Sequence, residues 1–362
     1  MTQQGLAQQL RRAWLARGPL ACGLWPLALL YGGLLRLRRL AYRMGWKHST
    51  RLPVPVVVVG NVVVGGAGKT PTVIGLANHL RQKGWTPGVV SRGHGGSSTG
   101  CVEVKPGTST AEVGDEPALI ARATGAPLVV GRQRVEAGKL LLAQHPEVDV
   151  IVCDDGMQHW ALARDLTVVV FDARGTGNGW LLPAGMLREP WPAKPWGNGQ
   201  MLVLCNQQGA QSEHAPFALQ TPWPVFRATR MLADHAVDAE GRQRALSSFA
   251  EEGGPVAAMA GIAQPEAFFS MLRERGLALN QELALPDHAD AELLLKTLAA
   301  SQTGRVWLCT EKDAVKLFPL LSASSTHEVW AVPLVQHPEP AFFAAVDAAL
   351  DGLSSAHGRQ TP

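Results

Sequence analysis

A run of β-branched residues ends in a glycine cluster and a Lys-Thr pair, and this stretch constrains the fold more than any other. Residues 56–71 read Val-Val-Val-Val-Gly-Asn-Val-Val-Val-Gly-Gly-Ala-Gly-Lys-Thr-Pro, and an apolar helical pattern follows over residues 73–80. A strand, a tight glycine loop and a helix start in this order form the context of a phosphate-binding P-loop. The sequence therefore predicts an α/β fold with a P-loop NTPase-like parallel sheet.

The residue types of the loop match the chemistry of phosphate binding. Backbone N–H groups of a glycine-rich loop turn toward phosphate oxygens, and the helix N-terminus adds a favourable dipole. Four residues are expected to bind the nucleotide in this way: Gly65, Gly66, Ala67 and Gly68. Lys69 would reach the β- and γ-phosphates, and the Thr70 hydroxyl would hold Mg²⁺. Val63 stands where the usual pattern has glycine, so a glycine-rich turn with a coincidental Lys-Thr remains the alternative.

The length and the charge distribution indicate several parts. With 362 residues, the chain is too long for one small core. We expect a basic, apolar membrane anchor over residues 1–50, a P-loop domain over 51–224, a second, smaller α/β domain over 225–350 and a disordered tail over 351–362. Residues 1–102 hold 13 Lys and Arg but no Asp or Glu, which is typical of a region that faces an anionic surface. The five scattered cysteines favour reduced thiols in an intracellular protein.

The anchor prediction rests on residues 18–35, which carry no charge. Basic residues follow, interleaved with aromatic residues: Arg36, Arg38, Arg39, Arg43 and Lys47. The uncharged stretch reaches about 27 Å as a helix, which is borderline for a bilayer. An interfacial, monotopic anchor fits best, a full span and an ordinary core helix are the alternatives, and the missing small-residue cleavage site disfavours a signal peptide. Pro19, Pro26 and the Gly32-Gly33 pair argue against one straight helix.

Polar residues follow several predicted strands of the P-loop domain. An apolar strand delivers Asp154 and Asp155, and acidic residues at such a position hold Mg²⁺ beside the Thr of P-loop enzymes. Which carboxylate contacts the metal stays open, because adjacent strand residues point to opposite faces. A solvated Asp-Asp-Gly turn is the alternative. Ser91 and Arg92 end another strand, where parallel sheets bind ligands, and Arg188 in a glycine-rich loop is a candidate clamp for phosphate or transition-state charge.

Two further segments have competing interpretations. Asp115 precedes an apolar helical pattern, so it is either an N-cap or a functional carboxylate. In the second domain, residues 305–309 form a strand that ends in Thr-Glu-Lys-Asp, similar to the base-reading loop of GTP-binding P-loop proteins. Lys312 would then lie over the nucleotide base and Asp313 would meet its polar edge. An N-capped helix start with ordinary charges is the alternative.

Several short blocks, each weak by itself, occur along the chain in a specific order. They are Gly60-Asn61 with residues 65–71, Ser91-Arg92-Gly93, Gly114-Asp115-Glu116-Pro117, residues 154–159, and Pro183-Ala184-Gly185 with Leu187-Arg188-Glu189. In this order they resemble the lipid A 4′-kinase (tetraacyldisaccharide 4′-kinase) family, and the likeness runs from the anchor to about residue 335. Met157, where an aromatic residue is commoner, and His94, where Tyr is frequent, are tolerable departures.

The resemblance implies a membrane-associated kinase with two α/β lobes at the cytoplasmic face of the bacterial inner membrane. It would transfer the γ-phosphate of ATP to the 4′-hydroxyl of a tetraacylated glucosamine disaccharide 1-phosphate, which gives lipid IVA in lipid A biosynthesis. The implied partners are this lipid, ATP, Mg²⁺ and an anionic membrane surface, and neither a nucleic acid nor a protein partner is predicted. Asp115 would accept the proton of the sugar hydroxyl, and the resemblance assigns His288 as its partner. Lys69 and Arg188 would stabilise the transferring group.

Two other classes of function compete with this interpretation. A membrane-associated P-loop GTPase or GTP-dependent chaperone fits the Thr-Glu-Lys-Asp loop, but the Asp-Asp-Gly segment is too short for the expected Asp-x-x-Gly switch. A peripheral membrane scaffold with a degenerate P-loop is disfavoured by the intact Lys69 and Thr70 and by the two aspartates.

Overall fold

The computed structural model describes residues 12–105, 107–197, 199–208, 219–251, 254, 256–287, 289–300, 306–321 and 327–354. Contacts divide the chain into two compact units. Unit 1 comprises Met1–Arg92, Ala126–Thr229 and His337–Pro362, and unit 2 comprises Gly93–Gly125 and Arg230–Gln336.

Unit 1 is built on a parallel β-sheet. Six strands form its centre: β1 (Val56–Gly60), β2 (Pro87–Ser91), β4 (Leu128–Val130), β5 (Val150–Asp154), β6 (Leu166–Phe171) and β7 (Gln200–Gln208). They lie in the order β7-β6-β1-β5-β2-β4, and each of these pairings is parallel. β8 (Val225–Leu232) and β15 (Leu334–Pro338) extend the sheet beyond β7. Every residue of β1, β2, β4, β5 and β6 is buried, as expected of a parallel sheet with both faces covered.

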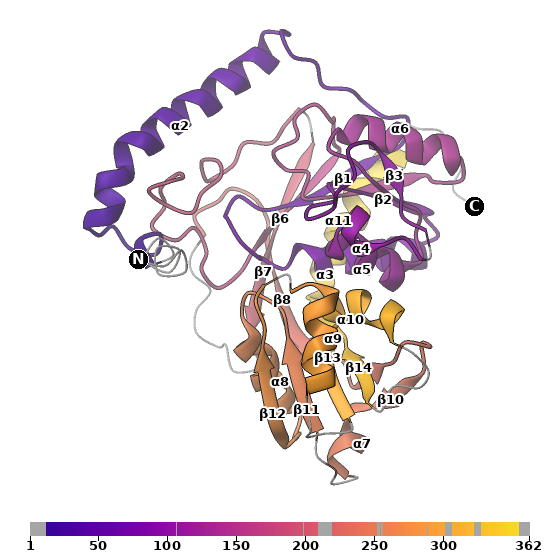
Figure 1. Ribbon diagram of the computed structural model, residues 1–362. Coiled ribbons are helices and arrows are strands. Elements are labelled where there is room, and N and C mark those ends of the chain that lie inside the picture. Colours follow the sequence, from indigo (N-terminus) through magenta and orange to yellow (C-terminus); the bar gives the residue numbers. More distant parts are fainter. Residues whose placement is uncertain are drawn as a thin grey trace. The chain divides into compact units, whose positions relative to one another are not determined.

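Helices pack on this sheet, and the parallel pairing of its strands places their carboxyl ends at one edge. α3 (Lys69–Gln82) contacts β1, β2 and β5, α6 (Arg134–Gln144) contacts β2 and β4, and α11 (Pro340–Ser354) contacts β6 and β7 (Figure 1). Because β1 pairs in parallel with both β5 and β6, the loops that follow these three strands emerge at one edge of the sheet. The predicted α/β fold with a parallel sheet is confirmed, and this edge carries the P-loop and the Asp-Asp pair.

The N-terminal segment forms one uninterrupted helix, α2 (Pro19–Arg43), drawn in indigo in Figure 1. The residues that argued against one straight helix do not interrupt it. Pro19 lies in the first turn, where its missing N–H is not needed, and the helix continues through Pro26. Tyr31 donates a hydrogen bond of 2.8 Å to the carbonyl of Arg188, so α2 is attached to the core of unit 1.

The other side of α2 is apolar and exposed. The exposed leucines include Leu27, Leu29, Leu30, Leu34, Leu37 and Leu40. In the described part of the chain, α2 is the one helix that is long and apolar enough to cross a membrane, by length and composition alone.

Unit 2 contains a second, six-stranded sheet in the order β10-β9-β14-β13-β11-β12. Its strands are β9 (His235–Val237), β10 (Gln243–Ala245), β11 (Val256–Ala260), β12 (Leu279–Ala284), β13 (Val306–Thr310) and β14 (Glu328–Val332). β12, β11, β13 and β14 pair in parallel, whereas β9 runs antiparallel to β14 and to β10. The remaining elements are β3 (Val102–Glu103), α4 (Thr110–Val113), α5 (Asp115–Thr124), α7 (Leu246–Glu251), α8 (Pro265–Glu274), α9 (Ala291–Ala300), α10 (Glu311–Leu317) and the 3₁₀ helix η1 (Phe318–Leu320).

The core of unit 2 lies on both faces of this sheet. Ala258 and Leu308 belong to one buried cluster, whereas their neighbours Met259 and Cys309 belong to a second cluster. Successive residues of a strand point to opposite faces, so the central strands β11 and β13 are covered on both sides.

The two units differ from the contiguous domain ranges predicted from the sequence, 51–224 and 225–350. The segment 93–125, with α4 and α5, groups with unit 2, where α5 packs against α10. The chain returns to unit 1 at residue 337, because α11 packs on β6 and β7. Residues 351–354 belong to α11 rather than to the predicted tail, of which residues 355–362 lie outside the described residues.

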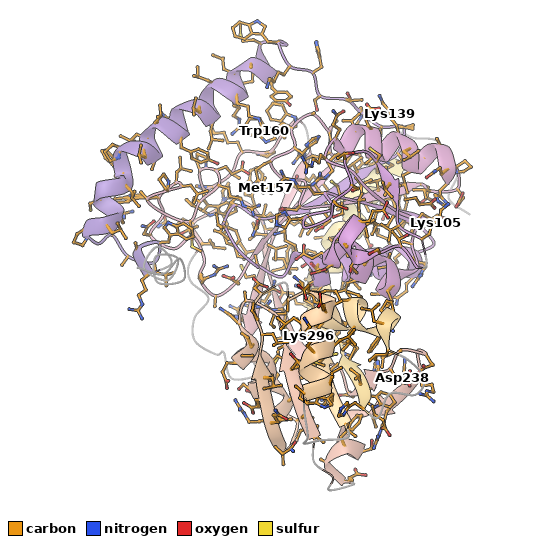
Figure 2. All side chains as sticks on the ribbon, in the orientation of Figure 1. Lys105, Lys139, Met157, Trp160, Asp238 and Lys296 are labelled. Atoms are coloured by element: carbon orange, nitrogen blue, oxygen red, sulfur yellow. The ribbon has the colours of Figure 1, made fainter. Side chains whose placement is uncertain are left out.

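Gly60 provides a test of how closely the Asp-Asp-Gly-Met loop packs on β1. A Cβ atom at Gly60 would lie 2.5 Å from the Cβ of Met157, which is labelled in Figure 2. We expect Gly60→Ala to lower the free energy of unfolding by about 1–3 kcal/mol in chemical denaturation, the usual cost of overpacking. Gly75→Ala is the matched control, because nothing lies within 4 Å of its Cβ position in α3. It should raise stability by about 0.5–1 kcal/mol, and equal effects of the two variants would contradict the packing argument.

Candidate active site

The P-loop of unit 1 has the backbone conformation that its glycines allow. Gly65 and Gly68 have φ angles of +100° and +90°, a region that disfavours side chains. Gly68 is the N-cap of α3, and Lys69 and Thr70 form the first turn of this helix. The free N–H groups of a helix N-terminus therefore face the loop, and such a terminus binds anions.

The departure at Val63 has a structural reason. Val63 is fully buried and forms an antiparallel bridge with Leu187. The N–H of Val64 donates to the carbonyl of Met186 at 2.9 Å, and the N–H of Arg188 donates to the carbonyl of Val62 at 2.6 Å. The loop is thus paired with the segment that carries Arg188, and a β-branched residue suits this pairing better than glycine.

Two polar side chains that the sequence analysis did not assign also contact the P-loop. Asn206 donates a hydrogen bond of 2.7 Å to the carbonyl of Ala67 from the carboxyl end of β7. Arg174 pairs with Asp172 at 2.6 Å, and its Nη1 lies 3.2 Å from the Cβ position of Gly65. The sequence signal for both residues was their position at or just after the carboxyl end of a predicted strand. Such ends meet at the ligand-binding edge of a parallel sheet.

The two adjacent aspartates have different surroundings. Asp155 has a left-handed backbone, with φ at +46°, that turns its side chain toward cations. Its carboxylate lies 3.6 Å from Lys69 Nζ and 3.3 Å from Arg188 Nη1. Burial by itself would raise the pKa of Asp155, but the charges of Lys69, Arg188 and Arg134 together lower it below its usual value. Asp155 therefore remains ionised beside the two cations.

Asp154 ends β5 and is almost completely buried. It accepts a hydrogen bond of 2.9 Å from the hydroxyl of Ser91, which is also buried. The prediction that Ser91 meets a phosphorylated ligand is therefore not supported, because its hydroxyl serves Asp154.

His159 lies in a strongly basic environment. Four arginines act on its imidazole: Arg134, Arg164, Arg38 and Arg92. Burial and these positive charges lower the pKa of His159 from 6.5 to about 4. His159 is therefore neutral near pH 7, and the surrounding arginines provide the charge that attracts an anionic ligand.

The donor set suits a magnesium ion held together with nucleotide phosphates. Among the described residues, no group of three or more His, Cys, Asp or Glu side chains is arranged to hold a metal ion. Mg²⁺ typically uses one or two carboxylates, water and substrate phosphates. The hydroxyl of Thr70 and the carboxylates of Asp154 and Asp155 fit that requirement in their chemistry.

In unit 2, Asp115 begins α5 and has a basic partner that the sequence analysis missed. Lys316 of α10 lies 3.0 Å from the Asp115 carboxylate and is itself buried. Lys316 Nζ also donates a hydrogen bond of 2.7 Å to the carbonyl of Ala289. Ala289 follows His288 in the chain, whereas His288 itself, the predicted partner of Asp115, lies outside the described residues.

The Thr-Glu-Lys-Asp segment forms a capped helix start. The N-cap of α10 is Thr310, whose hydroxyl accepts from the N–H of Asp313 and donates to its carboxylate at 2.6 Å. Asp313 is fully buried and also accepts from the N–H of Gly261 at 3.0 Å. Lys312 pairs with Glu116 at 2.8 Å. The predicted contact of Asp313 with a base edge is not supported, because its carboxylate is buried in the capping interaction, whereas the position of Lys312 over the base stays a prediction.

The lowered pKa of His159 predicts a pH dependence of stability. The unfolded chain binds a proton at this residue below about pH 6.5, whereas the folded protein does not until about pH 4. The unfolded state therefore binds more protons in this window, and the free energy of unfolding falls as the pH decreases through it. We expect His159→Gln to make this fall shallower in denaturant titrations at several pH values. An unchanged slope in His159→Gln would contradict the prediction.

Comparisons with known proteins agree with this arrangement. The family described as tetraacyldisaccharide-1-P 4′-kinase matches residues 20–351. The tetraacyldisaccharide 4′-kinase of Polaromonas naphthalenivorans is 52% identical over 361 residues, which cover 98% of this chain and 100% of that protein. The corresponding protein of Acidovorax ebreus is 51% identical and covers 97% and 96% of the two chains.

A solved structure extends the likeness to the fold. The crystal structure of LpxK from Aquifex aeolicus in complex with ATP superposes with a TM-score of 0.74 at 28% identity, over 93% of this chain and 99% of that chain. The chain belongs to the tetraacyldisaccharide-1-P 4′-kinase family, and the resemblance seen in its motifs is confirmed.

Proposed function

We propose that the protein transfers the γ-phosphoryl group of ATP to the 4′-hydroxyl of a tetraacylated glucosamine disaccharide 1-phosphate, which yields lipid IVA. The observation that carries this proposal is the family match over residues 20–351, with relatives of about 50% identity that bear this activity in their names. The ATP complex of the Aquifex aeolicus protein supports ATP as the phosphoryl donor.

Phosphoryl transfer requires positioning and charge stabilisation more than covalent chemistry. Lys69 and the N–H groups of residues 65–68 would hold the β- and γ-phosphates. Arg188 Nη1 lies 3.3 Å from Oδ1 of Asp155, the same oxygen that Lys69 approaches at 3.6 Å. A triphosphate that binds to Lys69 would therefore place its transferring group within the field of a second cation, which stabilises the charge of the transition state.

Thr70, Asp154 and Asp155 are the proposed Mg²⁺ ligands. The metal ion would neutralise the charge that develops on the phosphate oxygens. Asp155 offers an ionised carboxylate beside Lys69, and Asp154 is oriented by Ser91. Of the two carboxylates, that of Asp155 would lie nearer to the Mg²⁺ ion, and that of Asp154 would act on the ion from the end of β5.

Asp115 is the proposed base for the sugar hydroxyl, with His288 as its partner. A general base must be held in one orientation to accept a proton in the transition state. The buried Lys316 contributes to this orientation, because it bonds to Asp115 and to the carbonyl next to His288 at the same time. Lys312 and Glu116 form a second ion pair between α10 and α5.

The competing function as a GTPase or GTP-dependent chaperone lacks support. The family and the relatives described above are kinases. The segment that favoured GTP, Thr-Glu-Lys-Asp, forms a helix cap with a buried Asp313.

The acceptor lipid and helix α2 favour a place at the bilayer surface, and we propose the cytoplasmic face of the inner membrane. The exposed leucines of α2 would lie among acyl chains, and the basic residues that follow would meet anionic headgroups. The enzyme would thereby meet a lipid that is concentrated in the same plane.

The proposed activity is tested by incubating the purified protein with ATP, Mg²⁺ and the disaccharide 1-phosphate lipid, followed by mass analysis for one added phosphate group. We expect Asp115→Asn to lower kcat by about 10²–10⁴, the usual contribution of a general base. Glu136→Gln, on the exposed face of α6, is a control that should retain full activity. A product that lacks the added phosphate would contradict the activity, and a loss below tenfold in Asp115→Asn would contradict the assigned base.

Removal of residues 1–46 tests the role of the anchor. The truncated protein should lose more activity toward acceptor lipid in vesicles than toward acceptor lipid dispersed in detergent, because only vesicles require the enzyme to find a membrane surface. The measurement is the ratio of kcat/KM in the two systems. Equal losses would show that the segment acts on folding or catalysis rather than on membrane binding.

A further inference from the structure

A cavity of about 690 Å³ lies in unit 1, apart from the proposed catalytic residues. It is lined by residues that precede strands: Arg51 lies ahead of β1, Asp165 directly precedes β6, and Gln200 begins β7. Because these strands are parallel, their amino ends meet at the edge of the sheet opposite the P-loop. The six residues of β6 separate the two edges by about 20 Å. The cavity is therefore a separate site.

The cavity carries an excess of positive charge. Four arginines and one acid line it: Arg39, Arg43, Arg51, Arg164 and Asp165. Asp165 is already engaged, because it pairs with Arg51 at 2.6 Å and accepts from the N–H of Val56 at 2.9 Å. Arg164 is buried and bonds to the carbonyls of residues 157 and 159, each at 2.8 Å. In the described part of the chain, no acidic side chain forms an ion pair with Arg39 or Arg43.

Arg39 and Arg43 repel each other across one turn of α2. Arg39 donates to the carbonyls of Lys194 and Pro195, at 3.2 and 3.4 Å, but not to a carboxylate. Burial and the charge of Arg43 lower the pKa of Arg39 below its usual value. Like charges four residues apart destabilise a helix, and an anion between them would remove this cost.

The surroundings of the cavity resemble those of a membrane interface. Trp196 stacks on Trp160 with ring centroids 5.0 Å apart, and Tyr42 meets both rings edge-on. Trp160, labelled in Figure 2, also lies under the guanidinium groups of Arg38 and Arg39. Aromatic rings and arginines of this kind are enriched at the headgroup level of a bilayer.

Helix α2 leads from this cavity along an apolar surface. Leu30, Leu34 and Leu37 lie on one helical face and are exposed by 64, 57 and 63%. At about 100° per residue, Arg39 and Arg43 lie on the opposite side of α2, about 180° from Leu30 and Leu34, respectively. When the leucine face lies among the acyl chains, the two arginines therefore lie on the polar side of the helix, at the level of the phosphates of a phospholipid beside it.

We propose that this cavity binds the phosphate-bearing headgroup of an anionic bilayer phospholipid that is not the acceptor lipid. Arg39 and Arg43 bind the phosphate, Tyr42 and Trp196 border the glycerol portion, and the acyl chains extend into the bilayer to the depth of the leucines of α2. The volume falls in the range of sites that hold small ligands. The bound lipid fixes the orientation of α2 in the membrane. This inference rests on the membrane association proposed above, but not on the kinase reaction.

The test compares two single substitutions of exposed arginines on α2, Arg43→Gln in the cavity and Arg36→Gln outside it. The full-length protein is placed in nanodiscs of phosphatidylcholine with a minor fraction of phosphatidylglycerol, without ATP or acceptor lipid. Lipid retained on the released protein is counted by native mass spectrometry. We expect one retained phosphatidylglycerol on the unsubstituted protein and on Arg36→Gln, a loss of at least fivefold in Arg43→Gln, and partial recovery in Arg43→Lys.

Three outcomes would overturn the proposal. Equal losses in Arg43→Gln and Arg36→Gln would indicate diffuse attraction to the surface rather than a site. Displacement of phosphatidylglycerol by inorganic phosphate at equal concentration would indicate a site for free phosphate. Displacement by an equal amount of acceptor lipid would assign the cavity to the substrate. Because lipid retention is measured without turnover, its result does not depend on the result of the phosphorylation assay.

Discussion

The carboxylate of Asp155 joins the segments that form the proposed phosphate site. It contacts Lys69 from the start of α3 and Arg188 from the segment paired with the P-loop. Two cations so close to one another would repel in a partly buried site without an anion between them. The left-handed backbone of Asp155 turns its carboxylate to this position immediately after β5. A bound triphosphate would bring further negative charge to the same cations, so the free protein already has the charge pattern that the ligand needs.

In unit 1, the proposed phosphate site and the basic cavity lie at opposite edges of the parallel sheet, one strand length apart. Its carboxyl edge carries the P-loop and the aspartates, whereas its amino edge carries the cavity at the end of α2. Helix α2 reaches both, since Tyr31 bonds to the carbonyl of Arg188 and Arg43 lines the cavity. The twelve helical steps from Tyr31 to Arg43 span about 18 Å, close to the length of a strand. The helix that binds the membrane in our proposal is therefore attached to both edges.

Unit 2 uses buried polar groups to hold the start of α5 in place. The carboxylate of Asp313 accepts from the hydroxyl of Thr310, the N-cap of α10, and from the backbone N–H of Gly261, so it ties the ends of β13 and β11 together. The helix positioned in this way presents Lys316 to Asp115. Both hydrogen bonds are made to Oδ2 of Asp313, and they hold the Thr-Glu-Lys-Asp segment as a capped helix start.

The sequence by itself determined the features that depend on local pattern: the strand, loop and helix of the P-loop, the strand before Asp154, the family, and the α/β class. Periodicity and turn chemistry act over a few residues, so they can be read along the chain. Only the tertiary structure decided which distant groups meet. The contacts of Asn206 and Arg174 with the P-loop, of Ser91 with Asp154 and the grouping of residues 93–125 with unit 2 each join segments far apart in sequence. Such pairings follow from the packing of whole elements, so the neighbouring residues can indicate a strand end but do not identify the group that it contacts.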